Sequence, residues 1–166
     1  MPTTAWASPI QVNYPREAGL ALVTAIGMTM VVLAVIQLIP VTRDNPPVKT
    51  PITWDSDQTK RLVYSTCMDC HSNETTWPWY ASIAPSSWLM TMHVHDGRAQ
   101  MNLSEMDSMP SFQRQMLADN MANQIKMGSM PPKDYLFMHP DARLTDAEKT
   151  QLMEGMRQSL TNSLPR

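Results

Sequence analysis

Two cysteines and a histidine form the most chemically informative motif in the sequence. Cys67 and Cys70 are separated by two residues and His71 follows directly, which gives the pattern C-x-x-C-H. Two thiols at this spacing can add to the two vinyl groups on one side of a porphyrin, and the adjoining imidazole then lies beneath the iron. The pattern predicts one haem c, bound covalently through the two cysteines, with His71 as an axial iron ligand.

Other uses of the cysteine pair fit the sequence less well. A bridge across two residues would be a redox-active dithiol rather than a structural disulfide, and a thioredoxin-like dithiol belongs near a β-α-β pattern, which the sequence lacks. A zinc site needs two further sulfur or nitrogen ligands at matched spacing, and the chain has no third cysteine. Haem attachment is therefore the favoured interpretation.

The second axial ligand must come from another part of the chain. The chain has 16 methionines, most of which are expected to be flexible packing residues. Met130 differs by its setting, because the loop 128–132 follows a predicted helix, and Pro131 and Pro132 stiffen the backbone that would hold a weak thioether ligand in place. The alternatives are an open sixth position or one of three histidines: His93, His95 and His139.

Aromatic residues are concentrated after the histidine. They are first of all expected to be ordinary core residues, and three of them are also predicted to pack against the haem, with an indole N–H near a propionate: Trp77, Trp79 and Trp88. His71 is expected to donate its other ring N–H to a backbone carbonyl, that of Pro85 or Pro78, which would fix the orientation of the imidazole.

Helices are the elements predicted to position these residues. Asp55 or Ser56 can cap a helix that runs to about residue 66, just before the cysteines. Pro85 suits the first turn of a second helix, which Gly97 would end. Its expected apolar face carries Trp88, Leu89 and Met92, together with His95.

Two further helices complete the predicted domain. One follows Pro110 and ends at Gly128, and its apolar residues recur every four or five positions: Phe112, Met116, Met121 and Ile125. Residues 145–148 form a capping box that opens a last helix to about residue 160. No segment alternates apolar and polar residues as a strand does, so the sequence predicts an all-α, cytochrome c-like helical domain.

An uncharged apolar segment precedes this domain. Residues 18–39 contain no charged side chain, and as a helix they would span roughly 30 Å, the thickness of a bilayer's hydrocarbon core. A cleaved signal peptide would have a shorter apolar region and a small-residue cleavage site, and a buried core helix would rarely be so long without a charge. Residues 18–40 are therefore predicted to be a transmembrane anchor that ends at Pro40.

Composition limits the other functions. With 17% charged residues and a net charge of −2, the chain of 166 residues has no basic excess for nucleic-acid binding. We expect a short lead over 1–17, the anchor, a proline-rich extended linker over 41–53 that holds the domain away from the membrane, and one haem domain over 54–166.

Several runs of the sequence resemble a known family. CHSNETTWPWYASIAPSSWL, HDGRAQMNLSE and MPPKDYLFMHPDARLTDAEK look like the small bacterial haem-binding-domain family of c-type cytochromes, over about residues 54–160. The resemblance implies covalent haem c at Cys67 and Cys70, His71 as the proximal ligand and Met130 of the Met-Pro-Pro motif as the distal one. It also implies an N-terminal membrane anchor.

These features together predict an electron carrier rather than an enzyme. A mono-haem c-type cytochrome with histidine and methionine ligands would transfer single electrons as a subunit or partner of a membrane electron-transport complex, respiratory or photosynthetic. Haem c is attached outside the bacterial cytoplasmic membrane, so the domain is expected on the periplasmic or extracellular side. The alternatives are a redox or gas sensor, in which a ligand displaces Met130, and a haem peroxidase.

Overall fold

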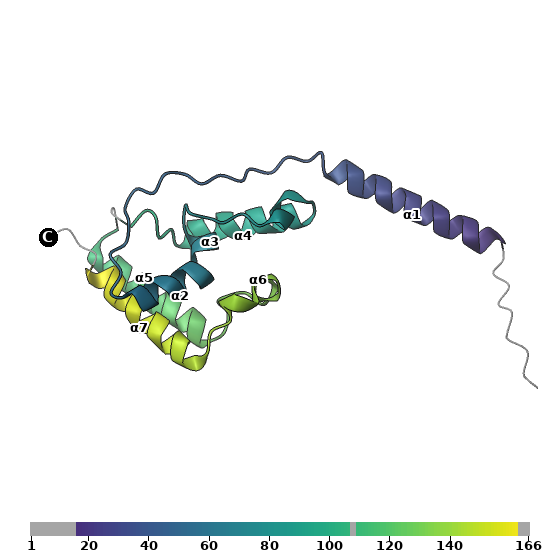
Figure 1. The fold of residues 1–166 in the computed structure, drawn as a ribbon. Helices are drawn as coiled ribbons and strands as arrows, with labels where there is room; N and C mark the ends of the chain where they lie inside the picture. Colours follow the sequence, from purple (N-terminus) through teal and green to yellow (C-terminus); the bar gives the residue numbers. More distant parts are fainter. Residues whose placement is uncertain (1–15, 107–108, 163–166) are drawn as a thin grey trace, which may run out of the picture. The chain divides into compact units, whose positions relative to one another are not determined.

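The computed structural model describes residues 16–106 and 109–162, and within these ranges the protein is all-α, as the sequence predicts. The helices, shown in Figure 1, are α1 (Arg16–Ile36), α2 (Asp57–Thr66), α3 (Met68–His71), α4 (Ser86–Gln100), α5 (Ser111–Lys126), α6 (Lys133–Met138) and α7 (Asp146–Asn162), with the 3-10 helices η1 (Trp79–Ser82) and η2 (Pro140–Ala142). The chain divides into two compact units between Pro40 and Val41.

The first unit contains α1, whose segment Glu17–Ile36 is long and apolar enough to cross a membrane. This segment has 20 residues, a mean hydropathy of 2.5 and no residue buried inside the structure. Turn hydrogen bonds continue past the helix to Ile39, where Pro40 follows. An apolar helix of this length near the N-terminus suits a membrane anchor or a signal sequence.

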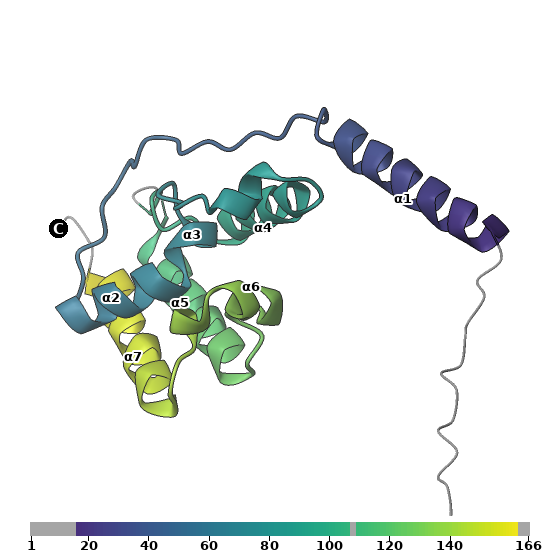
Figure 2. The ribbon, with the colours of Figure 1, turned by 45° about the vertical axis from the view of Figure 1, so that its right-hand side comes forward.

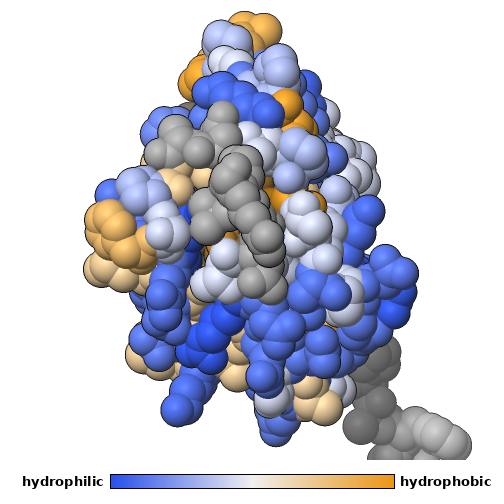
Figure 3. Space-filling model, turned by 90° about the vertical axis from the view of Figure 1, so that its left-hand side faces the viewer, coloured by the Kyte–Doolittle hydropathy of each residue, from blue (hydrophilic) through white to orange (hydrophobic). Residues whose placement is uncertain are grey.

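The core of the second unit lies where α7 packs against α5 and α2, while α3 packs against α4 (Figure 2). Twelve buried apolar residues form this core: Leu62, Val63, Met68, Met101, Leu103, Met106, Ala118, Met121, Ile125, Leu152, Met156 and Leu160. Five of them are methionines, so the packing role expected for most of the 16 methionines holds for these five. On the face shown in Figure 3, hydrophilic side chains predominate over hydrophobic ones.

Local sequence signals place the first and last helices of this unit correctly. The hydroxyl of Ser56 accepts a hydrogen bond from the Thr59 N–H at 3.2 Å and caps α2. Before α7, the Thr145 N–H donates to the Glu148 carboxylate at 2.8 Å, and the Glu148 N–H donates to the Thr145 hydroxyl at 3.3 Å. Both N-terminal predictions are confirmed, because capping depends only on neighbouring residues.

The predicted apolar faces of α4 and α5 are partly wrong. On α4 the buried residues are Ser87, Met90, Val94 and Gly97, whereas Leu89 and Met92 are exposed. On α5 Met121 and Ile125 are buried as predicted, but Phe112 and Met116 are exposed. Small residues such as Ser87, Gly97 and Ala118 are buried instead, and a pattern built on large apolar residues overlooks them.

The segment 41–53, predicted to be an extended linker, is docked on the domain in the structure. The backbone N–H groups of Lys49 and Thr50 donate to the Ser104 carbonyl at 2.9 and 3.1 Å. The Asn73 side chain donates to the Pro47 carbonyl at 3.1 Å, and Asn45 donates to the Thr75 carbonyl at 2.9 Å. The segment is extended, as its prolines predict, but its polar backbone groups bind the domain.

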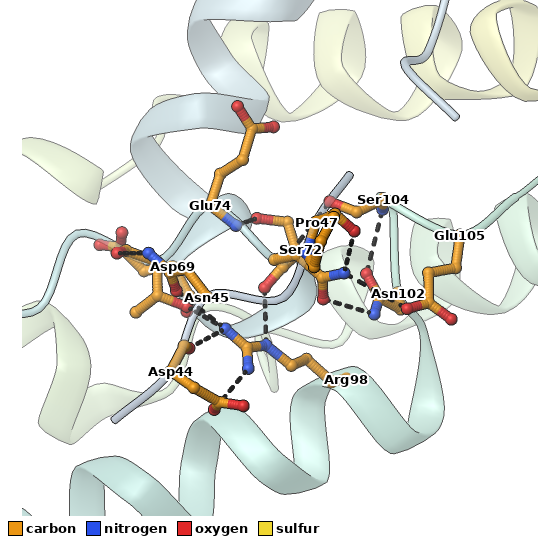
Figure 4. A network of polar contacts seen from close by, with 12 residues as sticks. Asp44, Asn45, Pro47, Asp69, Ser72, Glu74, Arg98, Asn102, Ser104 and Glu105 are labelled. Atoms are coloured by element: carbon orange, nitrogen blue, oxygen red, sulfur yellow. Dashed lines mark hydrogen bonds and ion pairs between the residues drawn. The ribbon is translucent and has the colours of Figure 1, made fainter. Parts of the chain in front are cut away.

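Arg98 is the centre of this docking, as Figure 4 shows. Its side chain is 14% exposed, and its Nε donates to the Ser72 carbonyl at 2.7 Å. One terminal nitrogen donates to the Asp44 carbonyl, the Asn45 side chain and the Thr75 hydroxyl at 3.0, 3.1 and 2.9 Å. Arg98 therefore joins α4, the residues after the cysteine motif, and the segment 41–53.

Replacing Arg98 with alanine should lower the free energy of unfolding by about 2 kcal/mol or more, because two acceptors on buried residues, the Ser72 carbonyl and the Thr75 hydroxyl, lose a charged donor. Hydrogen exchange should also become faster at the amides of Lys49 and Thr50, which depend on the docked segment. The matched control is Arg157→Ala, since Arg157 pairs with Asp119 at the surface. It should cost under about 1 kcal/mol, and an equal loss in both variants would contradict the special role of Arg98.

Candidate functional site

The cysteine motif lies on a single tight helical turn. Cys67 ends α2 and begins α3, and its N–H donates to the Val63 carbonyl at 2.8 Å. The N–H groups of Cys70 and His71 both donate to the Cys67 carbonyl, at 3.2 and 2.9 Å. The backbone of the motif is thereby fixed before its side chains bind anything.

His71 is oriented by two backbone carbonyls from α4 and the residue after it. Its Nδ1 lies 2.9 Å from the Gly97 oxygen and 3.2 Å from the Met101 oxygen. Both partners are acceptors, so Nδ1 carries the proton and Nε2 keeps its lone pair. A backbone acceptor was predicted, but its assignment to Pro85 or Pro78 is wrong. Burial lowers the pKa of His71, which favours the neutral imidazole that a metal requires.

Gly97 allows α3 to pack closely on α4. It does not end α4, which continues to Gln100. A Cβ added at Gly97 would overlap the Cys70 carbonyl oxygen and would lie 2.9 Å from the carbonyl carbon. Both atoms belong to the backbone and cannot move aside easily. The glycine is therefore required by the close packing of α3 on α4, and the prediction that it terminates the helix is wrong.

Gly97→Ala should separate α3 from α4 and lower the free energy of unfolding by roughly 1–3 kcal/mol, the usual cost of overpacking. Displacement of the Gly97 carbonyl should also weaken its hydrogen bond to the Nδ1 of His71. The nitrogen chemical shifts of the imidazole would report this change. Gly27→Ala is the matched control, because a Cβ at Gly27 meets nothing within 4 Å. Unchanged stability and unchanged imidazole shifts in Gly97→Ala would contradict the proposed packing role.

The two cysteine thiols are free and partly buried. Burial raises the pKa of Cys67, and the Thr66 hydroxyl 3.2 Å away partly opposes this rise. Burial, followed by the charge of Asp69, raises the pKa of Cys70 to about 11. Cysteines of redox-active C-x-x-C motifs have lowered pKa values instead. The electrostatics therefore do not favour a thioredoxin-like dithiol.

Met130 is placed by the way α5 ends. Gly128 has a φ of 70°, and its N–H donates to the Ile125 carbonyl at 3.1 Å, while the Ser129 N–H donates to the Gln124 carbonyl at 3.0 Å. This pair of bonds is a Schellman motif, which glycine permits because it adopts positive φ without strain. The motif turns the chain sharply and leads directly into Met130.

His71 and Met130 line the same three neighbouring cavities, the first of which has a volume of about 250 Å³. Cys70 also lines the first cavity, and Cys67 and Pro131 line the second. Most of the other lining side chains of the second cavity are apolar, including Met101, Met121 and Ile125. The structure thus brings together five of the residues that the sequence singled out, although Met130 is far from the cysteine motif in the chain.

The sequence did not predict a group of linked polar side chains on one wall of the first cavity. The Tyr135 hydroxyl donates to the Asp69 carboxylate at 3.0 Å, and the other Asp69 oxygen accepts from the Thr76 N–H at 2.9 Å. The Tyr135 ring stacks on His139 at 4.2 Å. Burial and Asp69 both raise the pKa of Tyr135, so this hydroxyl stays protonated. The only sequence signal for this wall was the run that follows Met130.

The three histidines considered as iron ligands have different surroundings. His93 lines the first cavity together with His71 and lies 3.7 Å from the Asp134 carboxylate. The side chain of His95 is 82% exposed. His139 is stacked on Tyr135, and its Nε2 lies 2.6 Å from the Tyr80 hydroxyl. Of the three, His93 is thus the one whose place suits iron ligation.

The three tryptophans predicted to contact the cofactor line none of the three cavities that contain His71 and Met130. Trp79 is 73% exposed on η1. The Nε1 atoms of Trp77 and Trp88 are buried and have no hydrogen-bond partner among the described residues. An indole N–H that reaches a propionate therefore stays a prediction for these two residues.

The donor atoms around the cavities suit one porphyrin iron better than a protein-ligated ion. Within residues 16–106 and 109–162, no group of three or more histidine, cysteine or acidic side chains is placed to hold a metal. What the site offers is a neutral imidazole, a thioether and two thiols around apolar space. That set fits haem c, in which the porphyrin itself supplies four of the iron ligands.

Comparison with known proteins agrees with this reading of the site. No curated protein matches the chain, and no solved structure matches it. The protein family described as "Haem-binding domain" matches residues 31–158, which include the cysteine motif, Met130 and most of the helical domain. This match covers well over half of the 166 residues, so the chain belongs to the Haem-binding domain family.

Proposed function

We propose that this protein is a mono-haem c-type cytochrome that transfers single electrons. The observation that carries the proposal is the placement of Met130 on the same cavities as His71. A histidine and a methionine that share a site are the axial pair of electron-transfer cytochromes c, and this pair raises the reduction potential. Membership of the Haem-binding domain family supports a haem protein of this kind.

Each residue of the site would have a separate task. Cys67 and Cys70 would hold the porphyrin through thioether bonds, and the carbonyls of Gly97 and Met101 would keep the Nε2 of His71 directed at the iron. The Schellman motif before Met130 would present its sulfur without a large entropy cost. When bound, haem supplies an iron that takes up and releases one electron, and no bond in a substrate needs to change.

We further propose that α1 anchors the protein in the bacterial cytoplasmic membrane. Support comes from the 20-residue apolar segment and from the exposure of its large side chains, which would otherwise face water. The haem domain would lie on the periplasmic or extracellular side, where haem c is attached. An anchored carrier would exchange electrons with a membrane electron-transport complex, as its partner or its subunit.

The proposal can be tested on the full chain, produced in a bacterium that attaches haem c and purified from its membranes. We expect one haem per chain, a pyridine haemochrome spectrum typical of thioether-bound haem, and reversible one-electron titration. Carbon monoxide should bind poorly to the ferrous protein, because Met130 occupies the sixth position. Rapid binding of carbon monoxide would instead favour a gas sensor or a peroxidase.

A further inference from the structure

A pocket of about 450 Å³ lies beside α2, apart from the cavities around His71. It is lined by residues of the docked segment 48–54, by two side chains of α2, and by Met68, Glu74 and Leu103. It shares no lining residue with the three cavities that contain His71. We call it the α2 pocket. Pockets that bind small molecules have volumes of about 300–1,000 Å³ and apolar walls with a few polar groups, and the α2 pocket has both properties.

Two aromatic rings line the α2 pocket together with aliphatic side chains. The ring centroids of Trp54 and Tyr64 are 6.3 Å apart, and the ring planes meet at 66°. Ile52 and Met68 line the same pocket. Aromatic rings gain extra stabilisation from edge-to-face and offset contacts with other rings. A flat ring is therefore the ligand shape that these walls suit.

Two charged side chains lie beside the Tyr64 ring. The Tyr64 hydroxyl donates to the Glu74 carboxylate at 3.5 Å, and the Nζ of Lys60 lies 5.7 Å from the centre of the ring. Both charged side chains are exposed and line the pocket, and no ion pair joins either of them to another described residue. Figure 4 shows that the Glu74 carboxylate points away from Arg98. The pocket thus presents an acceptor at the hydroxyl end of Tyr64 and a donor over its ring.

The α2 pocket also borders the cysteine motif. Met68 lines this pocket, and Cys67, its neighbour in the chain, lines the second cavity around His71. Adjacent Cα atoms are about 3.8 Å apart. A ligand in contact with Met68 would therefore lie one residue away from the thioether that Cys67 would form with haem. This position suits a ligand that exchanges electrons.

We propose that the α2 pocket binds a hydroquinone, a flat ring with two hydroxyl groups, which donates electrons to the haem. This inference rests on the haem attachment and the one-electron function put forward above. The ring would lie against Trp54 and Met68, one hydroxyl would donate to Glu74, and the other oxygen would accept from Lys60. A neutral ligand fits because the pocket carries one charge of each sign.

The protons and electrons of this reaction all have a destination. A hydroquinone that becomes a quinone loses two electrons and two protons. Glu74 would take the first hydroxyl proton and pass it to water, because its side chain is exposed, and the second proton would go to water directly. Two ferric haems become ferrous for each hydroquinone, either in two chains or in one chain that its redox partner reoxidises between the two steps.

Binding can be measured without electron transfer. 4-Methoxyphenol has the same flat ring with one free hydroxyl, but it cannot become a quinone simply by losing two electrons and two protons. In the full, haem-loaded ferrous chain we expect it to shift the indole N–H resonance of Trp54 until the pocket is saturated. Trp79 is the internal control, since it does not line the α2 pocket. A constant Trp54 resonance, or one that changes only with protein concentration as a second copy of the chain in the pocket would cause, would overturn the proposal.

Electron transfer is tested by mixing durohydroquinone with the ferric protein without oxygen. The rate of haem reduction should saturate with durohydroquinone, and Glu74→Gln should lower it about tenfold or more, because the proton acceptor is lost. The matched control is Glu154→Gln, which removes an exposed carboxylate of α7 and should leave the rate unchanged. Both positions are exposed, so neither change should disturb folding.

Two failures can be told apart. A rate that does not saturate and is equal in wild type and Glu74→Gln would overturn the hydroquinone site, while potentiometric titration would still show a reversible one-electron haem. A chain purified without covalent haem would overturn the proposed function itself, and the inferred electron donation with it.

Discussion

Replacing both Cys67 and Cys70 with alanine should abolish covalent haem attachment. The chain contains two cysteines in all, so the double variant has no thiol left to form a thioether. Haem that stays with the polypeptide during denaturing electrophoresis should fall to background, and the mass increment of haem should disappear from the intact chain. No other variant is expected to have a larger effect on cofactor content.

The control for this experiment is Ser65→Ala, two residues before Cys67. The Ser65 hydroxyl bonds to the Leu62 carbonyl within α2, and its removal should leave haem content unchanged. In the wild-type protein, neither thiol should react with an alkylating reagent after denaturation, because both are occupied as thioethers. Haem that survives denaturation in the double variant, or free thiols in the wild type, would contradict covalent attachment.

The cysteine motif shows which parts of the site the sequence could predict. C-x-x-C-H specifies its own chemistry, because the three reactive groups lie on one helical turn, and the N-caps at Ser56 and Thr145 follow from equally local rules. Met130 could also be singled out, since the turn that positions it is encoded by Gly128 and the following prolines. In each case, neighbouring residues carry the information.

The partners of His71 could not be predicted in the same way. A backbone carbonyl was the correct class of acceptor, but which one it is depends on how closely α4 approaches α3. That approach is set by Gly97, and a glycine late in a helical pattern reads locally as a helix end. The structure shows that its missing side chain, rather than its backbone freedom, is what the fold uses.

Polar contacts between residues far apart in the sequence could not be predicted either. The prolines of the segment 41–53 predict an extended chain, but they say nothing about the Arg98 side chain that binds it more than fifty residues away. Tyr135 and Asp69 are likewise far apart in the sequence and are joined by a side-chain hydrogen bond. Such pairs depend on tertiary geometry, which a single sequence does not reveal.

Met130→Ala should lower the reduction potential by tenths of a volt, within the roughly 0.8 V range over which axial ligands tune haem iron. A thioether favours ferrous over ferric iron, and its loss leaves water or a stronger donor in its place. The weak long-wavelength absorption of methionine-ligated ferric haem should vanish in the same variant. Potentiometric titration and absorption spectra would measure both effects.

Met127→Ala is the matched control, because Met127 lies three residues earlier, is 70% exposed and lines none of the three cavities around His71. Its potential should match that of the wild type. His93→Ala tests the other candidate for the sixth ligand, since His93 also lines the first cavity. If the wild type lacked the long-wavelength band, and the potential were unchanged in Met130→Ala but changed in His93→Ala, the sixth ligand would be His93. The site would then be a bis-histidine one, with a lower potential than the methionine assignment predicts.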